Sequence, residues 1–308
     1  MRIAITGSTG MIGIALAEAA LNEGHEVIAF VRQGSDKREN LPVSDRLMIT
    51  ECDISNYKNI MGTEECDIFF HLAWDKTFGE GRDDTLTQLK NIGYTLDAVD
   101  LAKSWNASVF IGAGSQAEYG KKDEKLSGST RTDPTSGYGI AKYSAGKLSR
   151  IRCEQLGLRH CWTRILSVYG EGDAPHTLIS YLIDTLMKGD VPELTRCEQM
   201  WDYVYSNDAA RALLMTGLHG KDGKTYCIGS GDCRPLKDHV CDVRDAVDPS
   251  LELKFGAKEY YPHQPMMLCA DISELTEDTG FVPKYDFKEG IARTVRCVRD
   301  QKSISRKD

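Results

Sequence analysis

The sequence lacks a Cys-x-x-Cys pair, an apolar run of membrane length and any run of basic residues. Ten cysteines and seven histidines are present, but none combine at a zinc-ligand spacing, so we expect reduced, mostly buried thiols and no metal. No apolar stretch approaches the ~18 residues of a membrane span, and the first residues are strand-like, so we expect a cytoplasmic protein without membrane contact. The net charge of −8, with scattered Lys and Arg, argues against a nucleic-acid partner.

Internal repeats, low-complexity stretches and Gly/Ser linkers are also missing. The 308 residues suffice for one large α/β domain with an appended lobe. Apolar strands alternate with helical stretches, beginning with a strand at 2–6, a helix at 14–22 and a strand at 25–31. This alternation predicts an α/β fold with a doubly wound parallel sheet covered on both faces. The pattern loosens after about Gly170, which predicts a smaller, interleaved C-terminal lobe.

Glycines mark the junction between the first strand and the first helix. The string Gly7-Ser8-Thr9-Gly10-Met11-Ile12-Gly13 places backbone N–H groups and the positive end of the helix dipole where they can bind a pyrophosphate. Although the spacing departs from Gly-x-Gly-x-x-Gly, its place between strand and helix predicts a Rossmann dinucleotide site. The expected cofactor contacts are Gly7, Thr9, Gly10, Met11, Ile12 and Gly13. We expect the Rossmann domain over 1–170, with return segments near 201–228, and a substrate-binding lobe mainly over 171–308.

The end of the second strand bears on the choice between NAD and NADP. An acidic side chain there binds the ribose hydroxyls of NAD, whereas an Arg accommodates the 2′-phosphate of NADP. This strand ends in Arg32, with Lys37 and Arg38 close behind and no carboxylate at its tip. The sequence therefore favours NADP(H) over NAD(H). Asp53, after the next short strand, is placed either to meet the adenine edge or to form a turn.

Tyr138 and Lys142 stand at i and i+4 after a turn, so a helix starting there presents both on one face. An adjacent ammonium is expected to lower the pKa of a phenol by favouring the phenolate. Tyr143 and Lys147 form a second, overlapping pair that faces elsewhere. Ser115 follows the apolar strand at 109–113, at the sheet edge where ligands bind in open α/β folds, and its hydroxyl can either cap a turn or bind a substrate oxygen. We expect Ser115, Tyr138 and Lys142 to be catalytic.

Taken together, these residues resemble the extended short-chain dehydrogenase/reductase superfamily, and within it the NAD-dependent epimerase/dehydratase family that acts on nucleotide sugars. The resemblance covers nearly the whole chain, and its motifs occur in the family's order. Besides the glycine loop and the Ser, Tyr and Lys just named, they lie at residues 71–73, 91–96, 163–172, 201–210, 270–273 and 279–283.

The resemblance implies hydride exchange between a sugar carbon and C4 of a nicotinamide. Tyr138 would move the hydroxyl proton, Lys142 would bind the nicotinamide ribose and tune Tyr138, and Ser115 would orient the oxygen. Further cofactor-site residues implied in this way are Ile54, Leu72, Ala73, Asn91 and Ile165, and the implied substrate contacts are Gln116, Tyr169, Arg196 and Trp201. The family's dimers predict a homodimer through helices at 86–105 and 138–156, unless those helices only cover the sheet.

Departures from the family pattern narrow the reaction. Ser115 is followed by Gln116 and Ala117, where family dehydratases carry an Asp-Glu pair, so dehydration is not expected. Trp201 replaces an Arg that often holds a diphosphate, which leaves Arg196 as the candidate substitute, and Ser167 stands where Asn is frequent. The expected activity is a nucleotide-sugar 4-ketoreductase or epimerase. The alternatives are a reductase or dehydrogenase of the same fold acting on another small carbonyl or alcohol, and a non-catalytic NADP-binding regulator.

Overall fold

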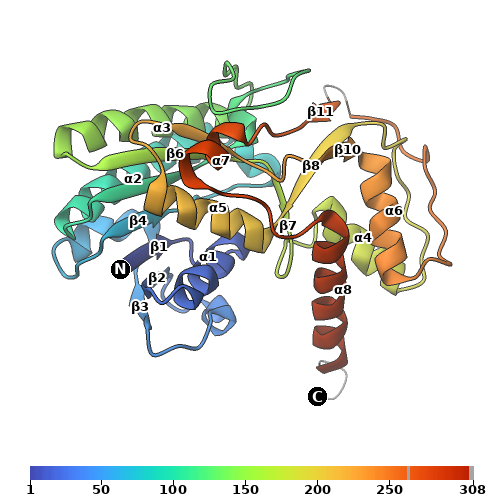
Figure 1. Cartoon of the computed structure of the whole chain (residues 1–308), viewed down its shortest axis with the longest axis horizontal. Coiled ribbons are helices and arrows are strands. Elements are labelled where there is room, and N and C mark those ends of the chain that lie inside the picture. Colours follow the sequence, from blue (N-terminus) through green and yellow to red (C-terminus); the bar gives the residue numbers. More distant parts are fainter. Residues whose placement is uncertain (262–263, 305–308) are drawn as a thin grey trace.

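The computed structural model of the chain describes residues 1–261 and 264–304 and shows a large sheet with helices on both faces, joined to a smaller lobe (Figure 1). All seven strands of the large sheet pair in parallel. Their spatial order is β3 (Leu47–Glu51), β2 (Glu26–Val31), β1 (Arg2–Thr6), β4 (Ile68–His71), β5 (Val109–Ser115), β6 (Arg159–Ile165) and β9 (Thr225–Ile228). This arrangement confirms the predicted doubly wound parallel sheet.

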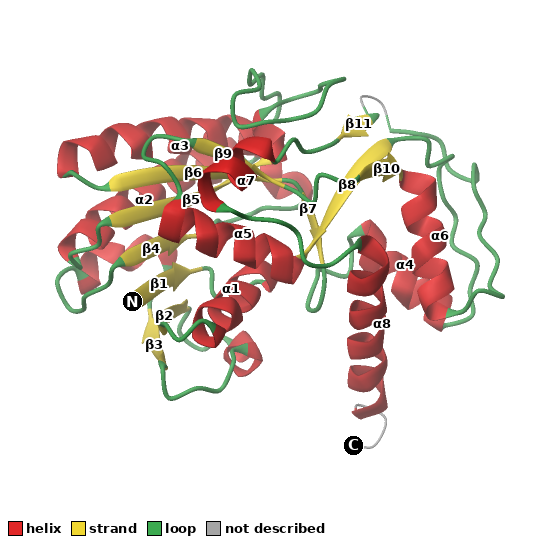
Figure 2. Ribbon diagram, in the orientation of Figure 1, coloured by secondary structure: helices red, strands yellow, loops and turns green. Residues whose placement is uncertain are grey.

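Helices cover both faces of the large sheet, as the layers in Figure 2 show. One face packs on α1 (Met11–Asn22) and α5 (Ser206–His219), and the other on α2 (Thr85–Ser104) and α3 (Gly137–Leu156). The strands are buried on both faces, which is why they are continuous apolar runs in the sequence rather than alternating ones. The strand order reverses between β1 and β4, and ligands of open α/β sheets bind at such a switch point.

The smaller lobe is built on a second sheet, in which β8 (Met200–Tyr205) pairs with β7 (Ser167–Tyr169), β10 (Cys233–Pro235) and β11 (Met267–Leu268). Its helices are α4 (Leu178–Met187), α6 (Leu236–Val247) and α8 (Phe287–Ile304), which stand together in Figure 1. The short α7 (Ser273–Thr279) returns to the large lobe beside α5 and β9. Within 201–228, β9 thus belongs to the large sheet, on which α5 packs, and β8 belongs to the small sheet. Within the described ranges, none of the helices combines the length and apolar character that a membrane crossing requires.

The thiols depart in one place from the sequence prediction. Cys233 on β10 and Cys269 just after β11 form a disulfide, with their Cα atoms 5.3 Å apart, whereas we expected reduced thiols throughout. Both cysteines lie near the same part of β8, since Cys233 is in register with Asp202 and Cys269 follows Leu268, which is in register with Trp201. The fold thereby brings together cysteines separated by 36 positions. Spacing along the chain gives no signal for such a contact. The other eight cysteines are free, and five of them are buried.

Candidate active site

The glycine loop lies between β1 and α1, as the sequence predicts. Gly7 has a φ of +71°, and a Cβ there would come within 2.8 Å of the Ala73 backbone nitrogen after β4. At Gly13, a Cβ would lie only 2.2 Å from the Gly7 carbonyl oxygen. Only glycine fits either position, so the first turn of α1 packs directly on the loop. Gly10 is exposed and is followed by the N-terminus of α1, where free N–H groups favour an anion.

A cavity of about 690 Å³ extends from this loop along the carboxyl ends of β4, β5 and β6 to the small lobe. It brings together the three predicted catalytic residues and most of the predicted cofactor contacts. The predicted residues that line it are Gly7, Gly10, Met11, Ile12, Gly13, Leu72, Ser115, Gln116, Tyr138, Lys142 and Ile165. One continuous cavity therefore holds both the dinucleotide loop and the Ser–Tyr–Lys group.

Tyr138 lies in the first turn of α3, which Ser136 caps by accepting a hydrogen bond from the Gly139 N–H at 3.1 Å. The side chain is 8% exposed. Burial raises the pKa of Tyr138, while the Ser115 side chain and the Arg82 guanidinium act to lower it. Desolvation is the largest of these contributions, so the pKa of Tyr138 is raised in this structure, and the predicted tuning of Tyr138 by Lys142 stays a prediction. Arg82 is also the nearer cation, 4.4 Å from the ring centroid against 5.9 Å for the Lys142 Nζ.

Lys142 is buried one turn farther along α3. Its Nζ donates to the Ala113 carbonyl at 2.5 Å and lies 3.9 Å from the centroid of the Trp74 ring. Burial lowers the pKa of Lys142 to about 7, and the Glu118 carboxylate opposes that shift. An ammonium so close to half-protonation at neutral pH can hold or release a proton beside Tyr138.

Ser115 ends β5 and caps the short helix η4 (Gln116–Glu118) by accepting a hydrogen bond from the Ala117 N–H at 3.2 Å. Glu118 completes a capping box, because its Oε1 accepts the Ser115 N–H at 2.8 Å. The same carboxylate, 1% exposed, accepts from Trp162 Nε1 at 2.9 Å and from Arg164 Nε at 2.9 Å. This buried network fixes the backbone on which the Ser115 hydroxyl stands, so capping and substrate binding are compatible roles for that residue.

A second cavity of about 700 Å³ is lined by Arg32 and Asp53, the residues predicted for the adenine end of the cofactor, and by the neighbouring ends of β2 and β3. Arg32 is exposed there. Arg38 forms an ion pair with Glu51 at 3.1 Å, and Lys37 instead lines the cavity of the glycine loop. Asp53 caps the helix η2 (Ile54–Ile60) by accepting from Ser55 N at 3.0 Å, so the turn-forming role that the sequence left open is present.

Several predicted contacts do not line either cavity. Tyr169 is 1% exposed in the core of the small lobe, where its hydroxyl donates to the Phe287 carbonyl at 3.2 Å. Arg196 is exposed outside the cavities, and Asn91 is buried on α2 with its amide on the backbone of Asp75. The Tyr169 ring thus packs in the core of the small lobe, and its predicted contact with the substrate stays a prediction. The other predicted residues outside the two linings are Thr9, Ile54, Ala73 and Trp201.

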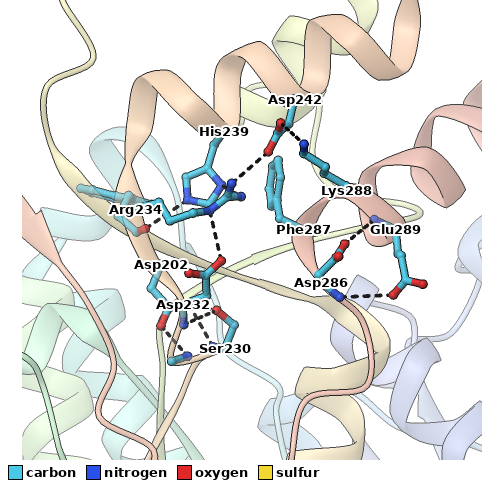
Figure 3. Close-up of polar contacts among 12 residues, drawn as sticks. Asp202, Ser230, Asp232, Arg234, His239, Asp242, Asp286, Phe287, Lys288 and Glu289 are labelled. Carbon is cyan, nitrogen blue, oxygen red and sulfur yellow. Dashed lines mark hydrogen bonds and ion pairs between the residues drawn. The ribbon is translucent and has the colours of Figure 1, made fainter.

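The two family departures, Trp201 and Ser167, contact each other. Trp201 Nε1 donates to Ser167 Oγ at 2.9 Å between β8 and β7. Arg234 is paired with Trp201 across the sheet. Figure 3 shows it among acidic partners, 3.1 Å from Asp232 and 3.1 Å from Asp242. At the two positions where the family often has Arg and Asn, this chain thus has a Trp and a Ser that are hydrogen-bonded to each other.

Sequence reasoning missed the segment at 74–84, which contributes Trp74, Thr77, Phe78 and Arg82 to the cavity of the glycine loop. Phe78 contacts His176 of the small lobe with ring centroids 4.4 Å apart, so the segment reaches from the large lobe to the small one. One signal in the sequence could have found this segment. It contains aromatic and basic residues directly after β4, and ligands of open α/β sheets bind at the carboxyl ends of the strands. The segment has no regular periodicity that would have placed these side chains.

Comparison with known proteins agrees with this geometry. The family model described as "NAD dependent epimerase/dehydratase family" matches residues 3–229. CDP-abequose synthase of Salmonella typhimurium is 25% identical, in an alignment that covers 96% of this chain and 97% of that protein. The dTDP-glucose 4,6-dehydratase of Escherichia coli is 24% identical, in an alignment that covers 98% of this chain and 94% of that protein. The solved UDP-glucose 4-epimerase of Thermotoga maritima shares the fold with a TM-score of 0.87 and 23% identity, over 98% of this chain and 100% of that one. The chain belongs to the NAD-dependent epimerase/dehydratase family.

Proposed function

We propose that the protein is a nucleotide-sugar oxidoreductase, either a 4-ketoreductase or an epimerase, with Ser115, Tyr138 and Lys142 as its catalytic residues. The observation that carries this proposal is the single cavity in which those side chains meet the glycine loop. Relatives named for the synthesis or epimerisation of nucleotide-linked sugars support the substrate class.

The residues divide the chemistry between them. A bound nicotinamide would accept or supply the hydride at the reacting sugar carbon. Tyr138 moves the hydroxyl proton, and the Ser115 hydroxyl at the end of β5 hydrogen-bonds the same oxygen. Lys142, with a pKa of about 7, binds the ribose and stabilises the phenolate when it forms. The buried Glu118 network keeps Ser115 in place without entering the reaction.

Dehydration does not fit the residues beside Ser115. Gln116 and Ala117 carry no acid or base, and both carboxylate oxygens of Glu118 accept hydrogen bonds from buried donors. Eliminating water requires an additional proton donor and acceptor at the sugar. This supports a reductase or epimerase over a dehydratase.

The function is tested with a panel of UDP-, GDP-, dTDP- and CDP-linked hexoses and 4-keto-hexoses. A reductase oxidises reduced cofactor in proportion to product, whereas an epimerase interconverts sugars without net change in cofactor absorbance. Nuclear magnetic resonance of the products distinguishes these outcomes. If no member of the panel binds or reacts while the dinucleotide binds, the nucleotide-sugar assignment is wrong.

We further propose that NADP(H) is preferred over NAD(H), because Arg32 lines the adenine-end cavity and no ion pair occupies it within the described chain. A charge-assisted contact with the 2′-phosphate contributes about 1.5–3 kcal/mol. Arg32→Ala should therefore weaken NADPH binding by roughly 10- to 100-fold and NADH binding far less. Dissociation constants of both cofactors for wild type and variant check this, with Arg38→Ala as control since Arg38 is already paired with Glu51. Tighter binding of NAD(H) than NADP(H) by the wild type would reverse the assignment.

A second candidate is a reductase acting on a carbonyl compound without a nucleotide. The hydrogen bond between Trp201 and Ser167 favours this candidate, because these two residues stand at the positions from which the family often binds the diphosphate. An inhibition experiment separates the two candidates. UDP, GDP, dTDP or CDP alone should inhibit an enzyme that acts on nucleotide sugars and should leave the activity of a reductase of nucleotide-free carbonyl compounds unchanged.

We also propose a homodimer in the cytoplasm. The exposed faces of α2 and α3 carry a group of large apolar side chains, which an antiparallel pairing of the same helices in a second copy would cover. These are Leu86, Leu89, Ile140, Leu148 and Ile151, each between 42% and 71% exposed.

A further inference from the structure

The segment at 74–84 is held in place by two buried amides of α2. Gln88, 2% exposed, donates to the carbonyls of Lys76 and Gly81 at 3.0 and 2.9 Å and accepts from Trp74 Nε1 at 2.9 Å. Asn91, fully buried, both accepts from and donates to the backbone of Asp75, at 3.0 and 2.9 Å. Although it contains little regular structure, the segment is therefore fixed relative to the sheet.

The same segment is also tied to the helix that carries Tyr138. Asp83 Oδ1 accepts the N–H of Gly137, the first residue of α3, at 2.7 Å. Arg82 next to it lies over the Tyr138 ring at 4.4 Å, and Trp74 meets the same ring edge-on at 6.0 Å. Arg82 is thus held beside the reacting group by anchors on α2 and α3.

The Arg82 guanidinium has donors left for further hydrogen bonds. Its one hydrogen bond within residues 1–261 and 264–304 runs from Nη1 to the Thr77 carbonyl at 3.4 Å, and no Asp or Glu of those ranges forms an ion pair with it. A guanidinium offers five donors in a planar fork that matches a carboxylate. A half-buried guanidinium that lines a cavity without a carboxylate partner is suited to an anion supplied by the ligand.

The other cations of the cavity are differently placed. Within the described part of the chain, its lining contains three cationic residues: Lys37, Arg82 and Lys142. Lys37 follows β2 at the cofactor end, and Lys142 already donates to the Ala113 carbonyl. Arg82 is therefore the cation available to the substrate beside Tyr138.

From this placement we propose that Arg82 binds a carboxylate on the sugar ring, so that the preferred substrates are nucleotide-linked uronic acids rather than neutral hexoses. The inference rests on the proposed nucleotide-sugar function. In a hexuronate the carboxylate is attached to C5, the ring atom next to C4. When the C4 oxygen meets Tyr138, that carboxylate lies close to the guanidinium stacked on the Tyr138 ring. The diphosphate is attached at C1, across the ring, and lies away from Tyr138.

The test compares matched pairs that differ only in the carboxylate, such as UDP-glucuronate with UDP-glucose and UDP-galacturonate with UDP-galactose. GDP-linked mannuronate and mannose extend the comparison to a second base. We expect wild-type kcat/KM to favour the uronate by roughly 10- to 100-fold, the range of a charge-assisted contact. Arg82→Gln should reduce that ratio at least tenfold, and Arg82→Lys should retain part of it because the charge remains.

Lys76→Gln is the matched control, because it removes a cation from the same segment, where Lys76 pairs with Asp84 at 2.5 Å outside the cavity. Its uronate-to-hexose ratio should equal that of the wild type. Cofactor dissociation constants for each variant verify that the folded site is retained. Equal or greater use of neutral hexoses by the wild type, or an equal loss for both members of a pair in Arg82→Gln, overturns the inference. Failure of every nucleotide sugar to react would instead overturn the proposed function on which it rests.

Discussion

Tyr138 and Tyr143 show at the scale of single residues how position on a helix selects a reactive group. Both are followed four residues later by a Lys, yet only Tyr138 lines the cavity of the glycine loop. Tyr143 instead faces Lys147, 5.6 Å from its ring, beside a small separate cavity near Trp162. The two tyrosines therefore provide an internal comparison.

Tyr138→Phe should lower kcat by ~10²- to 10⁴-fold, the contribution of a positioned acid–base group, with cofactor affinity nearly unchanged. Tyr143→Phe should remain within a few-fold of the wild type. Steady-state kinetics and cofactor titration measure both effects. Similar losses in the two variants, or losses in the reverse order, would show that the wrong tyrosine has been chosen.

Lys142 should make the free energy of unfolding increase as the pH rises above 7. Burial lowers its pKa in the folded protein to about 7, from the ordinary value of 10.5. Below pH 7 both states are protonated and the folded protein bears the full cost of burying the ammonium. Above pH 7 the folded state releases the proton first, so the cost declines as pH rises toward the unfolded pKa.

Lys142→Met should therefore be more stable than the wild type at pH 6, and the difference should shrink by more than about 1 kcal/mol at pH 9. Urea unfolding of dinucleotide-free protein measures the free energies. Lys147→Met, at an exposed position of the same helix, should show no such pH-dependent difference. A constant difference for Lys142→Met would mean that the buried ammonium keeps an ordinary pKa.

At the scale of secondary-structure elements, α2 has two faces with different tasks. Its buried face carries Gln88 and Asn91, which hold the 74–84 segment, while Leu86 and Leu89 are 71% and 64% exposed. Leu89→Glu should convert the proposed dimer into a monomer, because a carboxylate cannot be buried unpaired in an apolar contact. Light scattering after size-exclusion chromatography measures the mass. Val282→Glu, at a 59% exposed site beyond α7, is the control and should leave the mass unchanged.

The elements and the candidate site were predictable from the sequence to different extents. Tyr138, Lys142 and the glycine loop depend on local spacing around a helix start, which a sequence displays directly. Trp74 and Arg82 depend on hydrogen bonds from Gln88 to a segment without periodicity, so no local pattern placed them. Tyr169 was assigned to the substrate by resemblance, but Phe287, 118 positions away, accepts its hydroxyl in the core.

At the scale of the whole molecule, the disulfide closes the small lobe across a separation of 36 residues. In the loop-entropy description, a cross-link of that span stabilises a protein by about 3–4 kcal/mol. Reductant should lower the free energy of unfolding of the wild type by an amount of this order and leave Cys233→Ser unchanged. Thiol titration of the denatured protein without reductant should give eight reactive groups. Ten reactive groups would restore the original expectation of reduced cysteines.

The amide anchors of α2 also bear on how this enzyme can diversify. Gln88 and Asn91 form hydrogen bonds with the backbone of Asp75, Lys76 and Gly81. The one side chain of the segment that they bind is the Trp74 indole, so these contacts depend on the amino-acid sequence of the segment only at position 74. Residues 77–80 between those contacts, and the side chain at position 82, can be exchanged without disturbing the sheet or the glycine loop. We therefore expect that exchanging these residues for those of a relative transfers the relative's sugar selectivity and leaves the dinucleotide site intact.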